Sequence, residues 1–212
     1  MIIKTDRLSQ LLEEGRKLDT KDPLLIVPTP NLETLRTDGQ ASIDLRLGTW
    51  FVHSQQARTG CLSLKNQADY IEPTTAYVPF GQHYILHPQS FVLAITLEWI
   101  CFPRNLAAYV VGKSSWGRAG LIIATAIGVH PGYKGCLTLE LSNVGEIPIE
   151  IMPGVPICQL FIHQVESSTT QISDTSDFGG LRRPVFRPIK LDPFAEKLSK
   201  AYRTRSERTK VP

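Results

Sequence analysis

The sequence contains no long hydrophobic run and no leader-like N-terminus. Its apolar stretches are all shorter than the roughly 18 residues that a membrane-spanning helix needs. Residues 1–17 also lack the continuous apolar segment of a signal peptide. We therefore expect a cytoplasmic protein with no membrane partner.

Cysteine is scarce, with four residues in a chain of 212. They stand far apart, at Cys61, Cys101, Cys136 and Cys158, and form no C-x-x-C pair. This spacing argues against a zinc ribbon and a thioredoxin-like site. Lone cysteines in strand-like surroundings are usually small buried hydrophobes, and we interpret these four in that way.

Several fingerprints of common folds are missing as well. There is no G-x-G-x-x-G and no alternation of strands with helices, which excludes a Rossmann domain. The spacing G-x-x-x-x-G-K-[ST] of a Walker A loop is absent too. Hydrophobic residues make up 42% of the chain and charged residues 20%, so the chain as a whole is not disordered.

The small net charge of +3 hides an asymmetry along the chain. Residues 182–212 hold ten Lys/Arg and three Asp/Glu, a net +7, so the other 181 residues carry −4. A basic tail can bind nucleic acid, but this one contains few aromatic residues. We interpret it as a solvated helix and tail, and we expect no nucleic-acid partner.

Near the N-terminus, hydrophobic periodicity predicts a short amphipathic helix over residues 6–17. Leu8, Leu11 and Leu12 fall on one face of this helix, and Gly15 suits its C-cap. A proline-containing loop is expected to follow.

The C-terminal part divides into a loop and a second helix. Residues 167–184 are rich in Ser, Thr, Asp and Gly and predict a loop or lid. Residues 192–204 predict a helix, with Asp192 as N-cap and Pro193 at its first position.

Between these ends the chain consists of short β-like runs broken by Gly, Pro and Asn. Their number and spacing predict an antiparallel sandwich, jelly roll or barrel. The predicted strands are 42–48, 49–53, 83–87, 91–100, 107–112, 121–127, 136–143, 147–151 and 156–165.

The first segment with candidate chemistry is the predicted turn over residues 112–120, Gly-Lys-Ser-Ser-Trp-Gly-Arg-Ala-Gly. Glycines allow backbone N–H groups to approach a ligand, Ser114 and Ser115 can donate, and Lys113 and Arg118 can neutralise phosphate. By itself such a turn is equally typical of a solvated basic loop.

The second segment is the predicted strand 136–143, which has a carboxylate near its centre. Alternation places three leucines on one face and Glu140 on the other. One interpretation is a strand facing water, or a Glu paired with a buried Arg. The other is a partly desolvated carboxylate that acts as a general base.

The third segment, residues 124–135, reads as a strand followed by a Pro-Gly turn. His130 has no other histidine spaced to share a metal ion, so the residues suggest no metal site. Tyr133 either packs on a sugar or simply closes the turn.

Taken in order, these segments resemble the dCTP deaminase branch of the dUTPase-like superfamily. The resemblance covers roughly residues 6–165. The pieces that carry it are SIDLRLG (42–48), LHP (86–88), TLEWI (96–100), GKSSWGRAGL (112–121), TAIGVHPGYKG (125–135), LTLELSNVG (137–145) and PGVPICQL (153–160).

The resemblance implies a mainly β fold, a distorted jelly roll of the dUTPase-like β-clip kind with a short N-terminal and a C-terminal helix. Residues 1–166 would form the β domain, and residues 167–212 a lid-like loop and basic tail of the same domain. It also implies a homotrimer with active sites between subunits. The family works without zinc, and the H-x-E and P-C-x-x-C signature of zinc deaminases is absent here. Mg²⁺ would arrive on the nucleotide.

Carried over by position, Glu140 would be the catalytic base. It would take a proton from water, the hydroxide would attack C4 of cytosine, and the carboxyl would protonate the departing ammonia. Ser114 and the carbonyl of Ala126 would hold that water. Arg118 would keep Glu140 ionised and help polarise the base.

The same resemblance assigns substrate-binding positions. Lys113 and Ser115 would meet the triphosphate, and Phe178 would stack on the base. The full predicted set is Lys113, Ser115, Thr125, His130, Tyr133, Phe178 and Arg182.

Three departures from the family pattern bear on activity. Lys113 stands where the family usually has Arg, so the bidentate contact of a guanidinium with phosphate is lost. His130 stands where the family usually has an Asp, which binds the sugar or, in dUTPases, acts on the attacking water. In the segment 176–180, Asp177 replaces a phosphate-binding Lys, and Arg182 could compensate.

We therefore expect zinc-independent hydrolysis of dCTP to dUTP and ammonia, which feeds dTMP synthesis. One alternative is a bifunctional dCTP deaminase and dUTP diphosphatase, against which the missing Asp at position 130 argues. Another is a non-catalytic nucleotide-binding homologue, against which the presence of Glu140 and Arg118 argues.

Overall fold

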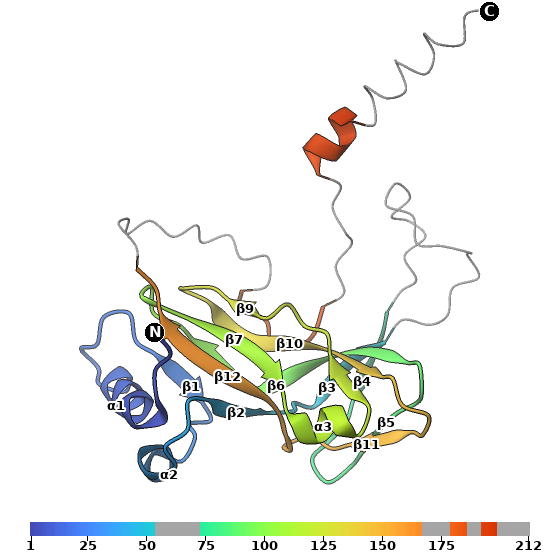
Figure 1. The fold of residues 1–212 in the computed structure, drawn as a ribbon, viewed down its shortest axis with the longest axis horizontal. Coiled ribbons are helices and arrows are strands. Elements are labelled where there is room, and N and C mark those ends of the chain that lie inside the picture. Colours follow the sequence, from blue (N-terminus) through green and yellow to red (C-terminus); the bar gives the residue numbers. More distant parts are fainter. Residues whose placement is uncertain (54–72, 167–178, 186–191, 199–212) are drawn as a thin grey trace, which may run out of the picture. The chain divides into compact units, whose positions relative to one another are not determined.

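The computed structural model describes residues 1–53, 73–166, 179–185 and 192–198 (Figure 1). The chain forms two compact units: residues 1–53 with 74–185, and residues 54–73 with 186–212. The predicted boundary between residues 166 and 167 stays a prediction, because residues 167–178 lie outside the described residues.

The first unit is mainly β, as predicted. Its helices are α1 (Thr5–Gly15), α2 (Leu32–Thr37) and α3 (Ser114–Arg118). Its strands are β1 (Leu25–Val27), β2 (Ile43–Arg46), β3 (Trp50–His53), β4 (Thr74–Tyr77), β5 (Tyr84–Leu86), β6 (Phe91–Cys101), β7 (Leu106–Gly112), β8 (Leu121–Ile123), β9 (Gly128–Val129), β10 (Lys134–Asn143), β11 (Ile149–Ile151) and β12 (Pro156–Gln164).

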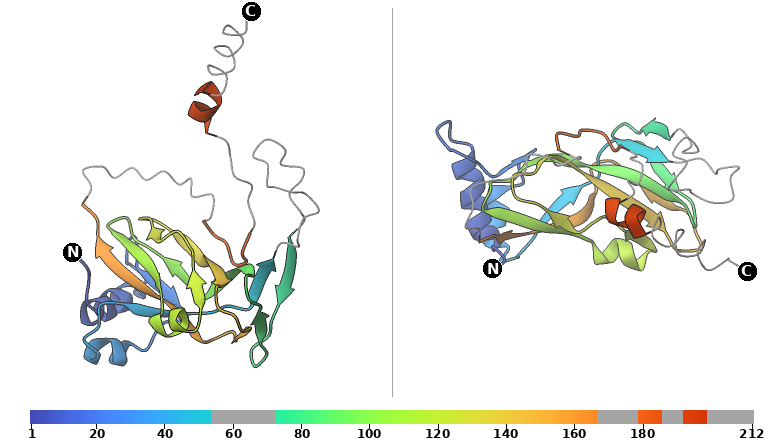
Figure 2. Two further views of the ribbon diagram at one scale, coloured as in Figure 1. Left: turned by 45° about the vertical axis from the view of Figure 1, so that its right-hand side comes forward. Right: turned by 90° about the horizontal axis from the view of Figure 1, so that it is seen from above.

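These strands form three antiparallel sheets. The largest has the order β4-β3-β6-β10-β8, with β1 also paired to β6. A second has the order β2-β12-β7-β9, and β11 pairs with β5 in the third. Buried side chains from all three sheets form one hydrophobic core, and α1 and α2 lie together at one end of the sheets (Figure 2).

Helix α1 packs on this core through its leucines, but Gly15 serves a different purpose from the predicted one. Gly15 is the last helical residue, and the C-cap is Arg16 in a right-handed conformation. A Cβ built on Gly15 would lie 2.3 Å from the carbonyl oxygen of Leu24. The glycine is therefore required because the chain before β1 passes directly against the helix.

Gly15→Ala is expected to destabilise the fold, because the backbone of Leu24 must move to admit one methyl group. Overpacking of this kind typically costs about 1–3 kcal/mol. Urea unfolding monitored by circular dichroism measures the change, with the exposed Lys17→Ala as the control. Equal midpoints for the two variants would contradict the close contact.

The proline-containing loop after α1 holds two elements that the sequence analysis missed. Strand β1 pairs with β6, and α2 begins where the Asn31 side chain accepts hydrogen bonds from Glu33 N at 3.0 Å and Thr34 N at 3.1 Å. Asn followed by helix-forming residues is a start signal that could have revealed α2.

An ion pair with a buried carboxylate joins the two larger sheets. The carboxylate of Glu98 on β6, only 2% exposed, accepts from Arg46 Nε at 2.7 Å and from Arg46 N at 2.8 Å. The Thr96 hydroxyl beside it donates to the Glu98 carbonyl at 2.9 Å and accepts from Leu137 N at 2.9 Å. A Glu–Arg pair of the kind considered above for Glu140 thus occurs at Glu98, although the Arg46 side chain is 37% exposed.

The second unit is described only in part. Residues 193–198 are helical and their side chains are exposed. Phe194 N donates to Asp192 Oδ1 at 3.3 Å, which confirms the predicted N-cap. Among the described residues, no helix is long and apolar enough to cross a membrane.

Three of the four cysteines lie in described parts of the chain. Cys101, Cys136 and Cys158 are buried free thiols, which confirms their interpretation as small hydrophobes. Burial raises the pKa of Cys136 to about 11 and that of Cys158 to about 12. Cys61 lies outside the described residues.

Candidate active site

Glu140 lies near the middle of β10 and points away from the core. Leu137, Leu139 and Leu141 are buried, whereas the side chain of Glu140 is half-buried, so the predicted alternation is confirmed. One departure is a register shift between Cys136 and Thr138, and Cys136 is buried as well.

Both the backbone N–H and the backbone carbonyl of Glu140 are hydrogen-bonded to the neighbouring segment 124–125. Its N–H donates to the hydroxyl of Thr125 at 2.7 Å, and its carbonyl accepts from Ala124 N at 2.8 Å. Because both polar groups of the peptide are bonded, the carboxylate extends from a rigid strand. Thr125, predicted to bind substrate, therefore contacts the predicted base directly.

The predicted strand 121–127 is too long, and Thr125 explains why. β8 ends at Ile123, and residues 124–127 leave the sheet before β9 begins. At this point the Thr125 hydroxyl, rather than a backbone carbonyl, accepts from Glu140 N. The ladder is interrupted, which leaves Ala126 exposed next to the strand that carries Glu140.

The predicted turn over residues 112–120 contains a short helix instead. Lys113 is the N-cap of α3, and Ser114 and Ser115 form its exposed first turn. Trp116 N and Gly117 N both donate to the Lys113 carbonyl at 3.1 Å. Arg118 stands in the last turn and is also exposed.

Contacts from other strands fix this helix, and the sequence analysis missed them. The indole N–H of Trp116 donates to the Pro156 carbonyl at 2.9 Å, and Lys113 N donates to Ile157 O at 3.3 Å. The ammonium of Lys113 pairs with Asp44 on β2 at 2.6 Å. These pairs are 40 to 69 positions apart, so no local pattern reveals them.

The Pro-Gly turn lies as predicted and gives its two predicted site residues different surroundings. Gly132 has φ 75°, and Tyr133 N donates to His130 O at 3.2 Å. His130 is exposed. The Tyr133 hydroxyl donates to Cys136 O at 2.8 Å, and burial raises its pKa well above its usual range. This hydrogen bond ties Tyr133 to the start of β10, and the predicted contact of Tyr133 with substrate stays a prediction.

Arg182 lies beside the first half of β10. Gly180 N donates to Lys134 O at 2.5 Å, and Cys136 N donates to Leu181 O at 2.9 Å. The charge of Arg182 acts on the Cys136 thiol, opposing the rise in its pKa that burial causes. Phe178 and most of the segment 176–180 lie outside the described residues.

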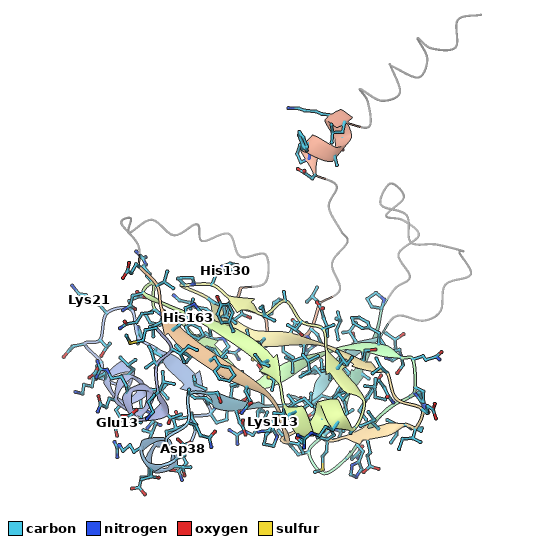
Figure 3. The ribbon with its side chains drawn as sticks, in the orientation of Figure 1. Glu13, Lys21, Asp38, Lys113, His130 and His163 are labelled. Atoms are coloured by element: carbon cyan, nitrogen blue, oxygen red, sulfur yellow. The ribbon has the colours of Figure 1, made fainter. Side chains whose placement is uncertain are left out.

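One chain brings only part of the predicted site together. Thr125 contacts Glu140, but neither Ser114 nor Arg118 forms a hydrogen bond or ion pair with it, although all four residues are described. Figure 3 shows Lys113 and His130 well apart on the molecule.

Among the described residues, neither a cluster of metal-ligating side chains nor the cavity beside α1 coincides with the predicted site. Among residues 1–53, 73–166, 179–185 and 192–198, no group of three or more His, Cys, Asp or Glu could hold a metal ion. A cavity of about 550 Å³ lies beside α1 and the chain start, and none of the predicted site residues lines it.

Comparison with known proteins agrees with the arrangement of these segments. The sequence profile of a family described as dCTP deaminase-like matches residues 11–165. A dCTP deaminase of Natronomonas pharaonis is 40% identical over 156 residues, which cover 72% of this chain and 77% of that protein. A dUMP-forming dCTP deaminase of Methanothermobacter thermautotrophicus is 35% identical over 201 residues, or 91% and 96% of the two chains.

A solved structure shows the same fold. The 2'-deoxycytidine 5'-triphosphate deaminase of Agrobacterium tumefaciens superposes with a TM-score of 0.53 at 19% identity, over 76% of this chain and 46% of the solved one. This likeness confirms the predicted β-rich fold class. With the profile match over most of its length, the chain belongs to the dCTP deaminase-like family.

Proposed function

We propose that this protein is a dCTP deaminase that releases ammonia from the cytosine ring. Support comes from the family, whose compared members carry that name, and from the chemistry of β10. The observation that carries the proposal is Glu140, a half-buried carboxylate whose backbone N–H and carbonyl are both hydrogen-bonded to the neighbouring residues Thr125 and Ala124.

In the proposed reaction dCTP and water give dUTP and ammonia. Glu140 takes a proton from water, and the oxygen of that water bonds to C4 of the cytosine. The C4–N bond then breaks, and the proton held by the carboxyl leaves with the amine as ammonia. The remaining proton of the attacking water passes to N3, which gives the C4 carbonyl of uracil. Such a positioned base typically contributes roughly 10²–10⁴-fold to the rate. The exposed carbonyl of Ala126 and the Ser114 hydroxyl are proposed to hold the water.

The phosphates would bind at α3. Its first turn carries the exposed residues Ser114 and Ser115, and its N-cap, Lys113, supplies an ammonium. Arg118, exposed in the last turn, supplies a second cation for the reacting site. Mg²⁺ is proposed to come with the triphosphate and not to be held by a protein cage.

A homotrimer with active sites between subunits is part of this proposal. The separation of Lys113 from His130 in one chain supports it, since both are proposed to contact the same nucleotide (Figure 3). Three-fold rings are an ordinary form of closed symmetry. We propose a cytoplasmic enzyme, without nucleic acid or membrane as partner.

A second candidate is a bifunctional enzyme that also hydrolyses dUTP to dUMP. The Methanothermobacter relative, whose match spans nearly the whole chain, is named dUMP-forming, and this favours it. Against it stands His130, an exposed imidazole at the position where a carboxylate would serve a second water. We therefore rank the dUTP-forming reaction first.

Separate assays for ammonia and pyrophosphate distinguish these activities. Purified protein with Mg²⁺ and dCTP is expected to release ammonia and dUTP in equal amounts, without zinc and without pyrophosphate. Pyrophosphate formed along with ammonia would establish the bifunctional enzyme. Binding of dCTP without either product would show a non-catalytic homologue and overturn the proposal.

A further inference from the structure

Lys113 forms an ion pair with Asp44, a residue that has no role in the proposed chemistry. Its Nζ donates to Asp44 Oδ2 at 2.6 Å. Asp44 belongs to β2, and Lys113 is the N-cap of α3, directly after β7. β12 lies between β2 and β7 in the sheet, so the ion pair spans β12. Figure 3 shows Lys113 beside α3.

Asp44 is itself held in place. Gln159 on β12 lies opposite Asp44 in the ladder, and its Nε2 donates to Asp44 Oδ1 at 3.2 Å and to Ser42 Oγ at 3.3 Å. Both carboxylate oxygens therefore have a partner. Because the amide fixes one oxygen, the other stays directed at Lys113.

We propose that Asp44 is a positioning residue that holds the ammonium of Lys113 ready for the phosphates of the nucleotide, an inference that rests on the proposed function. Lysine has three N–H donors, and Asp44 engages one, so two remain for phosphate oxygens. The backbone N–H of Lys113 donates to Ile157 O, so both the backbone and the ammonium of this residue are held in place.

Prior ordering explains why this arrangement favours binding. A free lysine side chain loses much rotamer entropy when a ligand immobilises it, and a side chain ordered on folding avoids that loss at the binding step. The carboxylate also repels phosphate, which opposes the effect. With Asp44 41% exposed, water and salt weaken that repulsion.

The test is Asp44→Asn, assayed for ammonia release against dCTP concentration. KM is expected to rise about tenfold, which corresponds to about 1.4 kcal/mol, with kcat within twofold. Asp19→Asn removes the same charge from an exposed connection and is expected to leave both constants unchanged. An unchanged or lowered KM in Asp44→Asn would overturn the proposal, the latter showing that Asp44 competes with the phosphates.

A double-mutant cycle separates positioning from a structural effect. If Asp44 acts through Lys113, Asp44→Asn added to Lys113→Ala is expected to raise KM less than twofold further. A full tenfold increase in that background would contradict the proposal. If Asp44→Asn unfolds, Gln159→Ala, which loosens the carboxylate but keeps the pair, takes its place with an expected rise of about threefold.

Calorimetry with inorganic tripolyphosphate keeps this test independent of the deamination. Wild-type protein is expected to bind it, and Asp44→Asn to bind it about tenfold more weakly. If wild-type protein releases no ammonia yet shows this difference, the proposed function fails and the role of Asp44 stands. If wild-type protein releases ammonia but tripolyphosphate binds both proteins equally, the role of Asp44 fails alone.

Discussion

Glu140→Gln is expected to lower the rate of ammonia release from dCTP by roughly 10²–10⁴-fold, the usual contribution of a positioned general base. The amide has nearly the shape of the carboxylate but cannot take a proton from water. Since Thr125 and Ala124 bond the backbone of residue 140 and not its side chain, the strand remains in place.

The measurement is ammonia release at saturating dCTP, beside calorimetric binding of dCTP and thermal unfolding. Binding and unfolding temperature are expected to match the wild-type values. Glu33→Gln, an exposed acid on α2, is the matched control with full activity. A Glu140→Gln protein that turns over dCTP at the wild-type rate would remove the proposed base from the mechanism.

The parts of the fold that follow local patterns could be predicted from the sequence. Alternation along β10 placed Glu140 outside the core, and Asp192 marked the start of the second-unit helix. Short, irregular elements could not be predicted in this way. β8 ends early because the Thr125 side chain replaces a ladder partner, which depends on Glu140, fifteen residues later.

The candidate site was predicted by resemblance more than by pattern. Nothing in the run 112–120 alone distinguishes a phosphate cradle from a solvated loop. The contacts that support it, from Asp44 to Lys113 and from Trp116 to Pro156, join positions far apart in the chain. Such pairs cannot be predicted from a single sequence, because they form only when strands distant in the sequence become neighbours in a sheet.

The pair of Arg46 with the buried carboxylate of Glu98 is another case of this kind, with partners 52 positions apart. Arg46→Met is expected to lower the free energy of unfolding by about 3–5 kcal/mol, because it leaves a buried charge uncompensated. The control is Arg36→Met, which breaks the exposed pair with Glu13 and is expected to cost less than about 1 kcal/mol.

Adding Glu98→Leu to Arg46→Met is expected to recover part of the loss, since it removes the uncompensated charge. It also leaves the backbone N–H of residue 46 without the carboxylate that accepts from it, so recovery is incomplete. Urea unfolding at one fixed protein concentration measures all four proteins, because association would otherwise shift the midpoints. The loss of unfolding free energy in Arg46→Met thus measures the penalty of leaving the Glu98 carboxylate buried without its partner, and not the net stabilisation by the ion pair. If Arg46→Met is no more destabilised than Arg36→Met, Glu98 is not held as a buried anion. The two larger sheets would then be held together by apolar packing alone.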